Sequence, residues 1–447
     1  MRDVRLVLVV VVIVILAGSA VAAGGGGGGT ILYQLAGHVV THNGAPGSGC
    51  YSFTFLRLLD AGTVRPDGGA RRTLELAEHP MTAVRAGGPA RCFHVATPAK
   101  PIKTMGPVGR SGVLEMTDWE APSQSIWETP LGGGKARAVL REEGGRFPGG
   151  LAVSPGNRYL VFPWVRRAAP AKGRVVFGRF DPSRAEGGLG IVDTATGKLR
   201  VILDGRYNRA LFSRFAGFSG DGRRFYTVAR RGSSFELEAV DLTTGRVEGF
   251  AARFPRFDGS ALRWQDLFPG KGDFSMALFA ISPDERRLVV TKDRYDQSRR
   301  GTACSCAVHH DLWIVPLDGG TARVKRGLPG YVAGIDWRRD GSRFVVASVD
   351  HCGCYPQYID SAIDLFDRDG KRLADLVTER RSKITGARWS PDGRAVAYDV
   401  YGTDFVGRLK TVRVASKTVR EVLNTGQLGI AVDRKHPVTI LVAGWLR

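Results

Sequence analysis

One short element occurs five times in this chain, and the repetition restricts the fold more than any other feature of the sequence. Each copy is an apolar strand, a turn of the type Ser-Pro-Asp-Gly, an arginine and a second apolar strand. A proline presets φ at the first turn position, and a glycine accepts a positive φ at the end, so the element predicts a β-hairpin. The five copies are Leu151–Phe162, Ala216–Val228, Phe279–Val290, Ile335–Val346 and Ala387–Tyr398.

A second hairpin follows each copy, built from a strand, a glycine-centred turn in most copies and another strand. Two hairpins in each unit make four antiparallel strands, which is the blade of a β-propeller. The spacings between successive turns are 65, 63, 56 and 52 residues. They exceed the roughly 40–50 residues of a minimal blade, so loops have been inserted. The second hairpins are Ile191–Ile202, Leu237–Val247, Leu312–Val324, Ile363–Leu373 and Lys410–Val422.

The two ends of the repeat region predict how the ring closes. Leu428–Trp445 supplies two further strands, and Ser125–Leu140 reads as a hairpin without its first two strands. A blade built from N- and C-terminal strands would remove the exposed sheet edges. We therefore expect an all-β, six-bladed propeller. Seven blades are the alternative, because Gly112–Trp119 could be a strand of an extra N-terminal blade.

The Ser-Pro-Asp-Gly-Arg element resembles the WD40-like Pro-Asp repeat of the TolB-like propeller family, over roughly residues 125–447. The resemblance implies a periplasmic propeller that docks a protein partner, although a fold does not by itself define a function. Residues 30–123 do not match the small α/β domain that precedes the propeller in TolB. We expect a small β-rich region at 30–123 and the propeller at 124–447.

The N-terminus predicts export. Residues Leu6–Ala23 carry no charge, two arginines precede them, and Ala20-Val21-Ala22 fits a signal-peptidase site. Eighteen uncharged residues are also the lower limit for a membrane-spanning helix. Residues 1–23 are therefore a signal peptide or an N-terminal membrane anchor, and 24–29 are a flexible glycine linker. In both cases we expect a periplasmic or extracellular protein, which the anchor would tether to the membrane.

The inserted loops gather on one face of the predicted ring. The strands of a blade are named A to D from the centre outward, so the Ser-Pro-Asp-Gly turn joins A to B. The B–C loops then emerge on the opposite face, which we call the B–C face. The long inserts Arg166–Gly188, Lys292–His310 and Asp350–Ser361 all fall there. Surface loops on a rigid scaffold are the usual place for binding residues.

Two neighbouring inserts carry four of the six cysteines, together with three histidines. Two disulfides between the loops are the simplest interpretation in an oxidising compartment. A zinc or copper site and a redox-active thiol pair are the alternatives. We expect Cys50 and Cys92 to form a separate disulfide. The predicted cluster comprises Cys304, Cys306, His309, His310, His351, Cys352 and Cys354.

The first insert is strongly basic in a chain whose net charge is +21. A basic rim would attract an acidic envelope protein, which we expect as the partner; an anionic polymer or lipid headgroups are alternatives, and so is simple solvation. Nucleic acid is not expected, because the chain is exported and has no reading motif. We expect a monomer. The candidate binding residues are Arg166, Arg167, Lys172, Arg174, Arg179 and Arg184.

The sequence contains none of the usual catalytic motifs. A nucleophile elbow, a His-Glu-x-x-His motif, a phosphate-binding loop and a dinucleotide fingerprint are all absent. The turn residues Asp284, Asp340 and Asp392 are expected to hydrogen-bond their own backbone. We therefore expect a non-catalytic, protein-binding scaffold with no cofactor and no catalytic residue. The alternative is a propeller enzyme or metal-binding protein that uses the Cys/His cluster.

Overall fold

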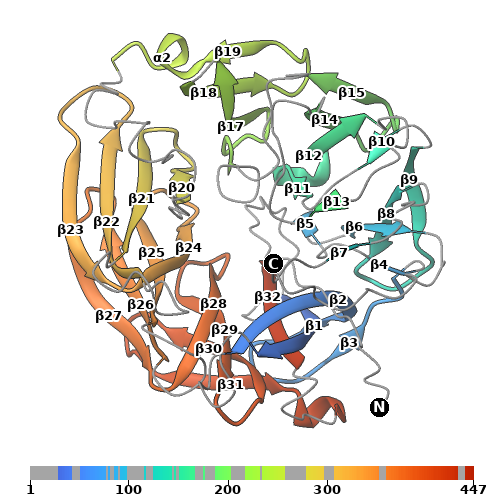
Figure 1. The fold of residues 1–447 in the computed structure, drawn as a ribbon, viewed down its shortest axis with the longest axis vertical. Coiled ribbons are helices and arrows are strands. Elements are labelled where there is room, and N and C mark those ends of the chain that lie inside the picture. The colour runs from blue at the N-terminus through green and yellow to red at the C-terminus, as the bar shows by residue number, and fades with distance from the viewer. Residues whose placement is uncertain are drawn as a thin grey trace.

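The computed structural model shows an all-β protein whose strands form a ring of seven small sheets (Figure 1). No helix among the described residues is long and apolar enough to cross a membrane, and the apolar segment 6–23 lies outside them. The structure describes residues 29–42, 51–76, 79–80, 85–88, 91–97, 115–116, 124–142, 145–146, 151–166, 175–176, 187–202, 217–231, 234–256, 278–295, 307–351, 359–430 and 438–446.

The blades are numbered here in chain order. The first contains β4 (His79–Pro80), β5 (Arg85–Gly88), β6 (Arg91–Thr97), β8 (Gln124–Pro130) and β9 (Arg137–Glu142). The second contains β10 (Gly145–Arg146), β11 (Ala152–Val153), β12 (Tyr159–Arg166), β14 (Gly187–Asp193) and β15 (Leu199–Ile202). The third contains β16 (Gly217–Phe218), β17 (Arg224–Arg231), β18 (Ser234–Asp241) and β19 (Val247–Gly249), followed by helix α2 (Phe250–Arg253).

The remaining blades are more regular. The fourth contains β20 (Leu278–Ile281), β21 (Arg287–Tyr295), β22 (Ala307–Pro316) and β23 (Arg323–Pro329). The fifth contains β24 (Tyr331–Trp337), β25 (Arg343–His351), β26 (Ile359–Asp367) and β27 (Arg372–Glu379). The sixth contains β28 (Ser382–Trp389), β29 (Ala395–Gly402), β30 (Gly407–Arg413) and β31 (Val419–Asn424). The seventh contains β32 (Val438–Leu446), β1 (Thr30–His42), β2 (Tyr51–Val64) and β3 (Arg72–Thr73).

The repeated turn forms because its serine and aspartate satisfy the local backbone. In the sixth blade the Ser390 hydroxyl donates to Asp392 Oδ1 at 2.6 Å and accepts from the backbone N–H of Ala395 at 2.9 Å. Gly393 closes the turn at a φ of 66°, which favours glycine. The backbone hydrogen bonds predicted for the turn aspartates are confirmed: N–H groups two residues later donate to Asp284, Asp340 and Asp392 at 3.0 to 3.2 Å.

The ring is closed by strands from both termini, as predicted, but with different partners. β32 pairs antiparallel with β1, from Thr30 opposite Leu446 to Gly37 opposite Val438, and β2 and β3 extend this sheet outward. Figure 1 shows the blue N-terminal strands beside the red β32. The hairpin 125–140 does not join this blade, because its β8 pairs with β6 in the first blade.

The preferred number of six blades is therefore wrong, and the alternative of seven is confirmed. The described strands between residues 30 and 97 belong to blades rather than to a separate β-rich region. Within the segment 112–119, considered as a source of the seventh blade, the residues that the structure describes form β7 (Glu115–Met116). This short strand pairs with β13 (Val175–Val176) of the first insert, outside the seven blades.

The core lies between adjacent blades. Val345 and Ile363 of the fifth blade pack with Ile384, Val396 and Tyr398 of the sixth, and none of these five side chains is exposed. Apolar side chains on the facing surfaces of neighbouring sheets interdigitate in this way around the ring. The scaffold that carries the loops is therefore held by packing between blades.

Candidate functional site

The predicted binding residues of the first insert lie almost entirely outside the described part of the chain. Arg166 is the last residue of β12, at the start of the insert. Arg167, Lys172, Arg174, Arg179 and Arg184 lie outside the described residues. Their role in binding stays a prediction.

The side chains of the predicted Cys/His cluster are described only at the two adjacent histidines in β22. Successive side chains of a strand point to opposite faces of the sheet. His309 is exposed, whereas His310 is 2% exposed and its Nδ1 lies 3.0 Å from the backbone oxygen of Gly330. Burial lowers the pKa of His310, so it is a neutral core histidine at physiological pH.

The structure describes no contact among the remaining five members of this cluster. His351 ends β25, while Cys304, Cys306, Cys352 and Cys354 lie outside the described residues. Within the described ranges, no group of three His, Cys, Asp or Glu side chains is placed to hold a metal ion. Disulfide, metal and redox roles for this cluster therefore all stay predictions.

Cys92 is fully buried in β6, and no disulfide joins it to another residue that the structure describes. Its Sγ lies 3.5 Å from the backbone oxygen of Thr129, to which it donates, and burial raises its pKa to about 12. A thiol with so high a pKa is chemically inert in the folded protein. Cys50 lies outside the described residues, so its predicted bridge to Cys92 stays a prediction.

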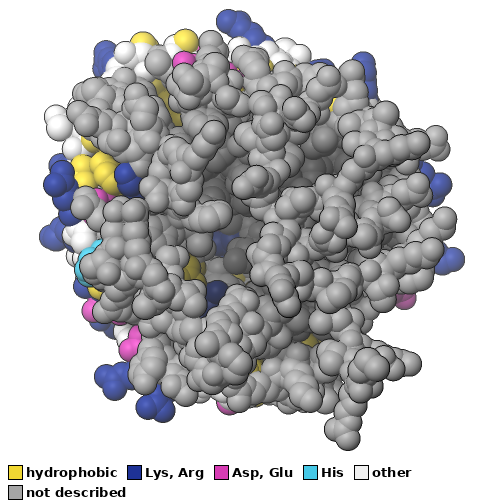
Figure 2. Space-filling model, viewed as in Figure 1, with side chains coloured by type: hydrophobic (Ala, Val, Ile, Leu, Met, Phe, Trp, Pro, Cys, Tyr) yellow, Lys and Arg dark blue, Asp and Glu magenta, His cyan; other side chains and the backbone are white. Residues whose placement is uncertain are grey.

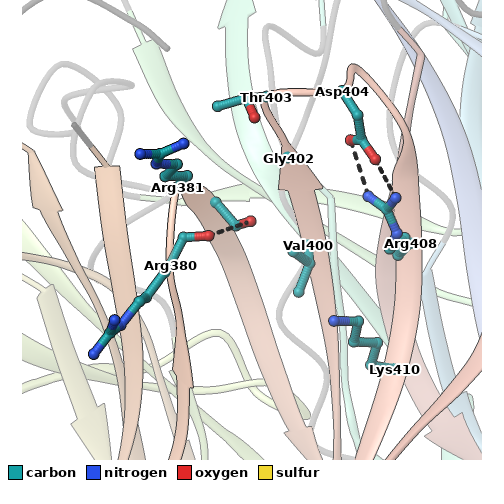
Figure 3. Close-up of a pocket in the computed structure, with 9 residues that line it drawn as sticks. Arg380, Arg381, Val400, Gly402, Thr403, Asp404, Arg408 and Lys410 are labelled. Carbon is teal, nitrogen blue, oxygen red and sulfur yellow. Dashed lines mark hydrogen bonds and ion pairs between the residues drawn. The ribbon is translucent and has the colours of Figure 1, made fainter. Parts of the chain in front are cut away.

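A basic pocket opens on the B–C face of the sixth blade. Its volume is about 330 Å³. One wall is the turn 380–381 that leads from β27 into β28, and the other is the B–C turn 403–406 between β29 and β30. Figure 3 shows Arg380 and Arg381 on one side and the Asp404–Arg408 pair on the other. The lining residues are Arg380, Arg381, Ser382, Val400, Gly402, Thr403, Asp404, Arg408 and Lys410.

Two of the four cations in this pocket are held by carboxylates. Arg408 forms an ion pair with Asp404, which raises the pKa of Arg408 and lowers that of Asp404. The Lys410 Nζ lies 2.9 Å from Oε1 of Glu379, which also accepts from the Tyr398 hydroxyl at 2.9 Å. These contacts fix the floor and one wall of the pocket before a ligand binds.

The other two cations are exposed. Neither Arg380 nor Arg381 forms an ion pair with any residue that the structure describes. The backbone N–H of Arg381 donates to Asp360 Oδ1 at 2.9 Å, which anchors the turn to β26. Figure 2 shows further Lys and Arg side chains around the rim of the ring, with fewer Asp and Glu in view. The guanidinium groups of Arg380 and Arg381 are therefore available to an anionic ligand at the surface of a basic protein.

A buried charge cluster, separate from the residues that line the pocket, joins the fifth, sixth and seventh blades. Arg388 of β28 is 2% exposed and interacts electrostatically with Asp336 of β24 and Asp399 of β29. Asp336 keeps part of its surface exposed, and its Oδ2 accepts from the backbone N–H of Trp389 at 2.8 Å. Asp399, 3% exposed, accepts from the backbone N–H of Val442 in β32 at 3.3 Å.

Desolvation controls the protonation of this cluster. Burial raises the pKa of both Asp336 and Asp399 to about 6, and it lowers the pKa of Arg388. Asp399 also accepts from the backbone N–H of Thr385 at 3.2 Å, at a β-bulge where β28 slips against β29. The bulged N–H is thereby satisfied by a side chain instead of by the neighbouring strand.

Sequence reasoning missed both the pocket and the charge cluster, although the repeats held a signal for the second. Asp336 and Arg388 occupy the same position in two successive copies of the repeat, immediately before a tryptophan. Equivalent positions of adjacent blades lie side by side, so opposite charges there predict an ion pair between blades. The pocket had no comparable signal, because its two turns come from different repeats.

The fold and site define a class of protein, a seven-bladed β-propeller with a basic pocket on its B–C face. No family model matches the chain, and no curated protein matches it. Solved structures that resemble it include TolB from Acinetobacter baumannii, at 14% identity and a TM-score of 0.35, covering 76% of this chain and 62% of TolB.

Other similar structures are enzymes. An oligogalacturonate lyase in complex with manganese is 15% identical, with a TM-score of 0.39, covering 60% of this chain and 62% of the lyase. A puromycin-hydrolyzing peptidase from Mycobacterium tuberculosis is 15% identical, with a TM-score of 0.47, covering 83% of this chain and 51% of the peptidase. The chain spans less than two thirds of the length of all three. At these identities the similarity concerns the propeller fold alone, and membership of the TolB-like family is not shown.

Proposed function

We propose that this protein is an exported, non-catalytic propeller that binds an acidic protein of the cell envelope through its B–C face. The observation that carries the proposal is the basic pocket of the sixth blade, which lies on the face where the sequence places its long inserts. Arg380 and Arg381 are exposed in this pocket and have no ion pair among the described residues. Unpaired guanidinium groups favour carboxylate-bearing partners.

The scaffold suits this role because the pocket rests on well-packed strands. Its floor residue Val400 is 2% exposed, and Tyr398 on the same strand is fully buried. Ser361 anchors the wall, since its hydroxyl donates to the backbone oxygen of Ser382 at 2.8 Å and accepts from Ile384 at 3.1 Å. A partner would therefore meet a pocket whose backbone walls are already ordered, which lowers the entropy cost of binding.

Export and the envelope location belong to the proposal and are supported by the apolar segment 6–23 and its Ala-Val-Ala exit. The net charge of +21 supports an acidic partner, because long-range attraction accelerates encounter with oppositely charged surfaces. The basic first insert, on the same face, would extend the contact beyond the sixth blade.

Capture of partners from an envelope extract tests this proposal. We expect the wild-type chain to retain an acidic protein that the Arg380→Glu/Arg381→Glu variant loses. The control is Arg286→Glu/Arg339→Glu, which reverses two exposed arginines in A–B turns on the opposite face. Unchanged capture by the pocket variant, or equal loss in the control, would contradict the proposal. A third variant with serine at the six cations of the first insert tests that loop separately.

A further inference from the structure

The two turns that frame the basic pocket are conformationally strained. Among the described residues, six non-glycine residues have a positive φ, and two of them lie in these turns: Arg381 at 50° and Phe405 at 61°. A side chain in the left-handed region costs energy that a glycine would not. The hydrogen bond from Arg381 N–H to Asp360 holds the first turn in this conformation. Strain of this kind, when the surrounding structure maintains it, often marks a binding site.

The charge balance of the pocket selects the kind of anion. Four cations line it, and four carboxylates lie around them: Asp404 within the pocket, Glu379 beside Lys410, Glu421, whose Oε2 lies 3.4 Å from Arg408 Nε, and Asp360, which accepts from the backbone N–H of Arg381. The ion pairs hold Arg408 and Lys410, so the guanidinium groups of Arg380 and Arg381 are the cations left for a ligand. A carboxylate brings one negative charge beside these four carboxylates, whereas a dianionic phosphate brings up to two and would face Asp404 across the pocket, so the surroundings favour the carboxylate.

We infer that the pocket is a carboxylate subsite in which Arg381 anchors one Asp or Glu side chain of an acidic polypeptide. The planar guanidinium group of Arg381 matches the two oxygens of a carboxylate. Arg380 and Lys410 supply further positive charge, and the hydroxyl of Thr403 lines the same space. This inference rests on the proposed function and adds which residue makes the contact and which chemical group it takes.

The structure suggests a variant that removes the anchor without harming the fold. Glycine at position 381 accepts the observed φ of 50° more easily than arginine does, and it keeps the backbone N–H that bonds Asp360. Arg381→Gly should therefore melt at the same temperature as the wild type or at a higher one. Any loss of binding in this variant reports the missing guanidinium group and not an unfolded protein.

The experiment measures binding of a fluorescein-labelled peptide of eight glutamates to the full chain by fluorescence anisotropy at low salt. We expect Arg381→Gly to weaken binding at least tenfold, Arg381→Lys to weaken it less, and the control Arg339→Gly to leave it within twofold. Inorganic phosphate at millimolar concentration should compete poorly. Two results would overturn the carboxylate subsite. One is an equal loss of peptide affinity in Arg381→Gly and Arg339→Gly. The other is that phosphate displaces the labelled peptide more strongly than the unlabelled peptide of eight glutamates does.

The outcome separates this inference from the proposed function. If Arg380→Glu/Arg381→Glu abolishes partner capture while the glutamate peptide ignores the pocket, the partner-binding face stands and the carboxylate assignment fails. If neither partner capture nor peptide binding depends on position 381, the proposed function and the carboxylate subsite both fail.

Discussion

Arg388 is the cation of the buried charge cluster, and replacing it with methionine tests what joins three blades of the ring. Arg388 is 2% exposed and Asp399 is 3% exposed, so neither charge is screened by solvent. Arg388 interacts electrostatically with Asp336 and Asp399, and removing one of two interacting buried charges costs about 3–5 kcal/mol because the other charge stays desolvated. We expect Arg388→Met to lower the free energy of unfolding by about this amount at pH 7.5.

The pH dependence of this loss follows from the raised carboxyl pKa values. Burial raises the pKa of Asp399 from 3.8 to about 6, because desolvation disfavours its ionised form. A carboxyl with a raised folded-state pKa contributes stability that is fully present below its unfolded pKa. This contribution is lost as the pH rises through about 6. Without Arg388 the ionised form is still less favourable, so the loss should be smaller at pH 5.0 than at pH 7.5.

Urea unfolding followed by tryptophan fluorescence at both pH values measures these differences. The triple variant Asp336→Asn/Arg388→Met/Asp399→Asn should recover most of the lost stability, because it leaves no unpaired buried charge. Arg286→Met, at an exposed arginine, is the control and should stay within about 0.5 kcal/mol of wild type. A loss below about 1 kcal/mol, or an equal loss at both pH values with no recovery in the triple variant, would refute this account.

Three further predictions concern packing, closure and the buried thiol. A methyl group at Gly190 would overlap the ring of Phe162, so Gly190→Ala should cost about 1–3 kcal/mol in urea unfolding, whereas Gly132→Ala meets no atom and should be nearly neutral. Removing residues 438–447 deletes β32 and reopens the ring; circular dichroism should then show no cooperative melting, and a native-like transition would contradict the closure described here. Cys92 should resist iodoacetamide in the native protein and react in urea, as peptide mass spectrometry would show; a reaction in urea only after reduction would instead support the predicted bridge to Cys50.

The sequence by itself determined the local elements of this protein. The five copies of the turn between Leu151 and Tyr398 and their second hairpins predicted the strands of the second to sixth blades, because both the turn and the strand depend on neighbouring residues. Ser390, Asp392 and Gly393 illustrate this, since each satisfies or shapes backbone within five residues. The predicted role of the turn aspartates was confirmed for the same reason.

Only the tertiary structure decided how the ring closes and where its site lies. β1 and β32 are about 400 residues apart in the chain, and their pairing carries no local signature in the sequence. The pocket likewise combines Arg381 from the turn before β28 with Asp404 from the turn after β29 and Arg408 from β30. A single repeat cannot specify such a site, because its charge, strain and shape arise where separate turns meet in three dimensions.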